Sequence, residues 1–90
     1  MPKNYSVLLK PKARDDIYTI ADYIAEKSQD LDVALLWEQS IHEHIQRLDL
    51  FPYGYSAYEI APYRKLLHGR YLVLFRIEEE ASLVIVCRVI

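Results

Sequence analysis

The hydrophobic residues of this 90-residue chain change their spacing once, and that change limits the folds that the chain can adopt. Up to Leu48, apolar side chains recur every three or four residues, which is the period of an amphipathic helix. From Tyr63 onward the spacing becomes that of strands, in which side chains alternate between two faces. Helices followed by hairpin-linked strands bury both apolar sets when the helices pack on one face of a sheet.

The expected elements have prolines and polar residues at their boundaries. Pro11 suits the first turn of a helix, where the missing N–H costs nothing, and Pro52 ends the second helix. Both ends of the stretch Pro52–Pro62 are prolines, which is typical of a connecting loop. In chain order we expect a strand over Tyr5–Leu9, helices over 12–27 and 32–50, and strands over 63–67, 70–77 and 83–90, with turns at His68-Gly69 and 78–82.

These elements predict an α+β fold: a two-layer β-α-α-β-β-β domain whose two N-terminal helices pack on one face of an antiparallel sheet. Ninety residues are enough for one domain only, so we expect residues 1–90 to form a single unit. The only cysteine, Cys87, has no partner for an intramolecular disulfide, and no apolar run reaches the ~18 residues of a membrane span. We therefore expect a cytoplasmic protein that does not bind membranes.

Cations gather in the stretch Pro62–Ile77, although the formal net charge of the chain is -2. The odd positions of 70–77 are all apolar and should face the helices, so the even positions should lie on the open face of the sheet. Together with neighbouring cations and His68, they predict a basic, partly apolar surface, although exposed cations also simply protect sheets from edge-to-edge pairing. The candidate target-binding or partner-binding residues are Arg64, Lys65, Arg70, Leu72, Leu74 and Arg76.

The histidines do not predict a metal site. His42 and His44 point to different sides of a helix, and the spacing H-E-x-x-H does not occur. His68 has a side chain suited to general acid or base chemistry, but it stands beside Gly69 and also fits an ordinary turn residue. We expect no metal, no cofactor and no small-molecule substrate.

Several segments together resemble the RelE/ParE toxin superfamily, and the similarity covers nearly the whole chain. Each segment is a loose apolar pattern with a few polar positions, so the resemblance lies in their order and spacing. The segments are A-x-x-D-I-x-x-I-A-x-Y-I from Ala13 to Ile24, L-x-x-F-P from Leu48 to Pro52, Y-R-K-L from Tyr63 to Leu66, G-R-Y-L-V-L-F-R-I from Gly69 to Ile77, and V-I-V-C-R-V-I from Val84 to Ile90.

The resemblance implies the toxin of a type II toxin–antitoxin module of the plasmid stabilisation type, which a cognate antitoxin protein neutralises. RelE-like members cut messenger RNA on the ribosome with basic residues of the open sheet face, whereas ParE-like members inhibit DNA gyrase. RelE-like enzymes typically carry an arginine after the aromatic residue of the middle strand, where this chain has Tyr71-Leu72. A sequence pI of about 5.9 is also low for a protein that grips ribosomal RNA.

These observations favour a ParE-like toxin that is not an enzyme, and two alternatives stay open. One is a ribosome-dependent, metal-independent endoribonuclease that acts on messenger RNA. The other is a degenerate, non-toxic relative that only binds its antitoxin. The candidate catalytic residues of the nuclease alternative are Arg64, His68, Arg70, Arg76 and Arg88.

Overall fold

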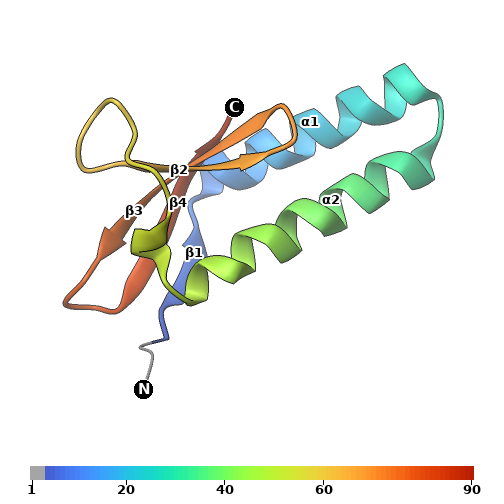
Figure 1. The fold of residues 1–90 in the computed structure, drawn as a ribbon. Coiled ribbons are helices and arrows are strands. Elements are labelled where there is room, and N and C mark those ends of the chain that lie inside the picture. The colour runs from blue at the N-terminus through green and yellow to red at the C-terminus, as the bar shows by residue number, and fades with distance from the viewer. Residues whose placement is uncertain (1–3) are drawn as a thin grey trace.

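The structure, a computed structural model, describes residues 4–90. Two long helices lie side by side and pack against a four-stranded sheet, so the predicted α+β two-layer domain is confirmed (Figure 1). In chain order the elements are β1 (Ser6–Leu9), α1 (Pro11–Ser28), α2 (Leu31–Gln46), two short 3-10 turns (Arg47–Asp49 and Pro52–Gly54), β2 (Arg64–His68), β3 (Tyr71–Glu78) and β4 (Leu83–Val89).

The sheet has the strand order β1-β4-β3-β2 and is mixed. Two antiparallel pairings join β2 to β3 and β3 to β4, as expected for hairpin-linked strands. In contrast, β1 runs parallel to β4, with Ser6 opposite Leu83 and Leu9 opposite Val86. The expectation of a wholly antiparallel sheet is therefore wrong for this one strand, because its partner is the last strand, whose direction the two hairpins determine.

Each helix begins one residue before its predicted start, and the second ends four residues earlier than predicted. Pro11 occupies the first turn of α1, and the carboxylate of Asp30 caps α2 by accepting a hydrogen bond from the Asp32 N–H at 2.9 Å. α2 stops at Gln46 instead of residue 50, because Arg47–Asp49 tighten into a 3-10 turn and Leu50 is extended in an isolated β-bridge with Asn4. No helix within residues 4–90 is long and apolar enough to span a bilayer.

The core lies between the helix pair and the sheet. The predicted inward face of β3 is confirmed, since Val73 and Phe75 are fully buried while Tyr71 and Ile77 pack at the core edge. The β2–β3 turn falls at Gly69-Arg70, one residue later than predicted, because Gly69 has a φ of 61° that glycine adopts without strain. The helices supply Ala13, Ile17, Ile41 and Ile45, and β4 supplies Val84, Val86 and Val89.

Candidate functional site

The open face of the sheet carries part of the predicted basic surface. On β3, Leu72, Leu74 and Arg76 alternate with the buried residues and therefore point away from the helices. The pairing of Lys65 with Leu74 and of Leu67 with Leu72 extends this face onto β2. Arg70 is exposed in the adjoining turn. We call Lys65, Leu67, Arg70, Leu72, Leu74 and Arg76 the open-face surface.

Arg64 and His68 lie on the opposite side of β2, so the prediction that they line the open face is wrong. Arg64 stands opposite the buried Phe75, and its guanidinium donates to the Tyr55 carbonyl at 2.7 Å. The same guanidinium lies 5.2 Å from the centroid of the Tyr53 ring. Arg64 thus links the Tyr53–Tyr55 segment to β2 by a hydrogen bond and a cation–π contact.

Two other candidate arginines are paired with carboxylates. Arg76 forms an ion pair with Glu78 on its own strand, which reduces the positive charge of the open-face surface. Arg88 contacts Asp16 of α1, with its Nε 2.7 Å from one carboxylate oxygen and its Nη2 3.2 Å from the other. The Val89 N–H also donates to Asp16 at 2.9 Å, so this carboxylate joins α1 to β4.

Replacing Asp16 with asparagine is expected to destabilise the fold by about 1–2 kcal/mol at neutral pH, because a charge-assisted hydrogen bond is lost. Partial burial opposes ionisation of Asp16, but hydrogen bonds from Arg88 and Val89 outweigh it, so its pKa lies below the ordinary value. A depressed folded-state pKa means that the stabilisation is present above the unfolded-state pKa and is lost as the pH falls through the folded-state pKa.

Urea unfolding of the wild type and the Asp16→Asn variant at pH 7 and below pH 4 measures this effect. The difference in unfolding free energy should shrink in acid. The exposed neighbour Asp15 supplies the control, since Asp15→Asn should change little at either pH. A stability difference for Asp16→Asn that does not depend on pH would contradict the assigned role of the carboxylate.

His68 takes part in a contact that the sequence did not predict. Its Nδ1 lies 2.8 Å from Nδ1 of His44 on α2, and its Nε2 lies 3.0 Å from the Ser40 hydroxyl. Trp37 packs edge-on against the His68 ring with the centroids 6.4 Å apart. Trp37, Ser40 and His44 share one side of α2 at spacings of three and four residues, a pattern that places them on a common face. Their partner on β2 was not recognisable from the sequence.

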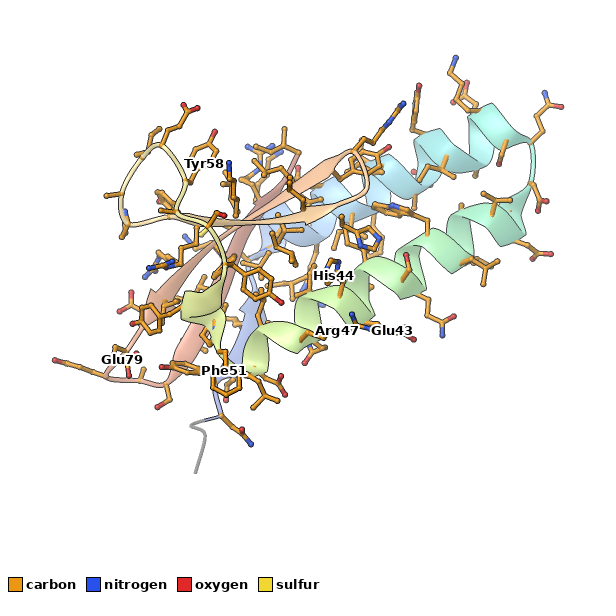
Figure 2. The ribbon with its side chains drawn as sticks, viewed as in Figure 1. Glu43, His44, Arg47, Phe51, Tyr58 and Glu79 are labelled. Atoms are coloured by element: carbon orange, nitrogen blue, oxygen red, sulfur yellow. The ribbon has the colours of Figure 1, made fainter. Side chains whose placement is uncertain are left out.

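Phe51 is a second feature that sequence reasoning missed. It is 69% exposed and has a φ of 52°, a left-handed conformation that bulky residues rarely adopt. The following Pro52 disfavours a helical Phe51 and is itself buried. Figure 2 shows Phe51 at the end of the molecule near the close of α2. With Tyr5, Pro52, Tyr53 and Gly54 it lines a pocket of about 270 Å³. Phe51 is therefore a surface residue despite its apolar side chain.

Comparison with known proteins shows similarity to one sequence family and to solved structures, two of which are described here. The sequence model described as ParE toxin of type II toxin–antitoxin system, parDE, matches residues 7–90. The structure titled "Chromosomal ParDE TA system from P. aeruginosa" is 21% identical, with 97% of this chain and 95% of that chain covered and a TM-score of 0.83. The RelBE2 toxin–antitoxin complex from Mycobacterium tuberculosis is 22% identical, with 97% and 90% covered and a TM-score of 0.63. Comparison with curated proteins found no match.

Proposed function

Because the chain belongs to the ParE toxin family of type II toxin–antitoxin systems, we propose that it inhibits DNA gyrase and that a cognate antitoxin holds it inactive. The family match confirms the resemblance found in the sequence, on the ParE side of the superfamily. The two solved structures described above are titled as a toxin–antitoxin system and a toxin–antitoxin complex, which supports an antitoxin as the partner of this chain.

We choose gyrase over messenger RNA as the target because the candidate nuclease residues do not lie together at one site. Cleavage of RNA needs several donors aimed at one phosphate, since each donor to the developing charge contributes about 100- to 1000-fold in rate. Arg64 faces the helix side and Arg88 is bound to Asp16. The open face instead presents Leu72, which has no donor. This arrangement favours docking over phosphate chemistry.

The open-face surface is the proposed contact with gyrase. Its apolar residues, Leu67, Leu72 and Leu74, supply area that a partner can bury, and Leu67 is 62% exposed. Lys65 and Arg70 have no ion pair within residues 4–90, so their charges are available to orient an acidic partner surface. The sequence analysis also proposed Arg64 as a docking residue. Its guanidinium is bound to the Tyr53–Tyr55 segment, so Lys65 and Arg70 are the proposed docking charges.

Expression of the chain in cells that carry a reporter plasmid tests the proposal. Induction should arrest growth and relax the plasmid, because inhibited gyrase no longer introduces negative supercoils. Co-expression of the cognate antitoxin should restore both growth and supercoiling. Growth arrest with unchanged plasmid topology would contradict the gyrase target, and normal growth without the antitoxin would support the non-toxic alternative.

A further inference from the structure

Three polar side chains, Ser40, His68 and His44, connect α2 to β2 by hydrogen bonds. The Ser40 hydroxyl donates to the Trp37 carbonyl at 2.8 Å and lies 3.0 Å from Nε2 of His68. Nδ1 of His68 lies 2.8 Å from Nδ1 of His44. Figure 2 shows His44 on α2, on the side of the helix that faces the sheet.

The hydrogen-bond pattern assigns the neutral tautomers of both histidines. A hydroxyl has a single proton, and Ser40 uses it on the Trp37 carbonyl, so the Ser40 oxygen must accept from Nε2–H of His68. Neutral His68 then has an unprotonated Nδ1, which accepts from Nδ1–H of His44. The remaining ring nitrogen, Nε2 of His44, is unprotonated and has no hydrogen-bond partner among residues 4–90. Within the set Ser40, His68 and His44, it is the ring nitrogen that can accept a proton from a ligand or from solvent.

The surroundings of His44 are electropositive. Burial lowers the pKa of His44 most, and the nearby His68 and Arg47 lower it further by charge repulsion. Two protons cannot face each other across the 2.8 Å contact, so the pair holds at most one positive charge while the contact persists. On α2 the adjacent Glu43 is exposed and accepts a hydrogen bond from Gln39 at 3.2 Å.

His44 forms part of the wall of a pocket of about 320 Å³ at the free edge of β2, where α2 and the segment 54–56 adjoin this strand. The pocket also includes Lys65 as a second basic residue, and none of the lining residues is acidic. The lining residues are His44, Gly54, Tyr55, Ser56, Lys65, Leu66 and Leu67. A pocket lined by two basic residues, two hydroxyl-bearing residues and no carboxylate is suited to an anionic group.

We propose that this pocket binds an aspartate or glutamate side chain of the antitoxin and that His44 takes up a proton when it does so. The inference rests on the proposed function for the existence of the antitoxin. A carboxylate accepts hydrogen bonds from protonated Nε2 of His44. A protein carboxylate fits better than a nucleic-acid phosphate, because a chain of formal net charge -2 gains little from a polyanion.

Proton uptake gives the site a measurable signature. A bound carboxylate stabilises the imidazolium, so binding raises the pKa of His44, and the affinity must rise as the pH falls through the range where His44 titrates. Carboxylates remain ionised above about pH 5, so they do not oppose this trend. We expect the dissociation constant of the antitoxin to fall by about tenfold between pH 8 and pH 6, which corresponds to an average uptake of about half a proton over this range.

Antitoxin titrations at fixed ionic strength across this pH range test the proposal. The variant His44→Gln should bind more weakly at pH 6 and lose the pH dependence. The matched control is His42→Gln, which lies two residues away on the same helix and outside the pocket, and it should behave as wild type. A pH dependence that persists in His44→Gln would overturn the assignment.

A second measurement needs no antitoxin. In the free protein, the NMR titration midpoint of the His44 ring should be higher in sodium acetate than in sodium chloride of equal ionic strength. An unchanged midpoint would overturn the claim that the pocket binds an anion. A larger rise in phosphate than in acetate would show that the pocket prefers phosphate and would overturn the assignment of a carboxylate ligand. Failure of the antitoxin to bind at all would instead overturn the proposed function. The acetate titration would still show whether the pocket binds a carboxylate.

Discussion

Phe75→Ala is expected to destabilise the domain by about 3–5 kcal/mol, which is a large share of the total stability of a domain of this size. Phe75 is fully buried at the centre of the sheet, and the Tyr55 ring packs edge-on against it with the centroids 6.0 Å apart. Removal of the ring leaves a cavity that the surrounding β-branched residues cannot fill. Thermal and urea unfolding monitored by circular dichroism should show a partly or fully unfolded variant.

Leu72→Ala is the matched control, because Leu72 lies on the same strand but faces the other side of the sheet and is only partly buried. Its loss should cost roughly 1 kcal/mol or less, since less apolar surface returns to water. Equal losses of stability at the two positions would mean that the assignment of the sheet faces is wrong.

Reversal of both free cations of the open-face surface should strongly weaken inhibition of gyrase. In the variant that combines Lys65→Glu with Arg70→Glu, attraction to an acidic partner becomes repulsion. We expect the concentration needed for half-maximal inhibition of supercoiling to rise by about tenfold or more at low salt and by less at high salt, where charges are screened.

A matched double variant separates docking from net charge. Arg14→Glu with Lys27→Glu makes the same change in charge on α1, where both side chains are exposed and distant from the open-face surface. This control should inhibit gyrase as the wild type does. Equal weakening by both double variants would indicate a general effect of charge and would remove the open-face surface from the proposed contact.

The inward face of β3 was predictable because its alternation is unambiguous. Every odd position from Tyr71 to Ile77 is apolar, and the opposite set includes Arg70 and Arg76, so only one orientation buries an apolar set. The two helix stripes were predictable for the same reason. In these segments the local pattern and the tertiary packing agree.

The orientation of β2 was not predictable in the same way. One alternating set of the segment contains Arg64, Leu66 and His68, and the other contains Lys65 and Leu67. Both sets mix polar with apolar residues, so the pattern favours neither face. The pairing of Leu66 with the buried Val73 decides the orientation, and it carries Arg64 and His68 to the helix side.

The remaining differences depend on contacts between distant segments. The contact between His44 and His68 spans 24 positions and requires α2 to lie over β2. The parallel pairing of β1 with β4 likewise joins the two ends of the chain. Neither arrangement leaves a local signal in a single sequence, because strand partners are chosen by packing and not by the spacing of residues within one strand.

We propose that this ParE-family chain acts on gyrase and not on messenger RNA, and parallel assays of one purified preparation test this proposal most directly. The protein is added to gyrase with relaxed plasmid and ATP, and separately to ribosomes programmed with messenger RNA. We predict that supercoiling is inhibited and that the messenger remains intact, because the open-face surface presents Leu72 and not a donor to the cleaved phosphate. Codon-specific cleavage of the messenger, with normal supercoiling by gyrase, would contradict the account.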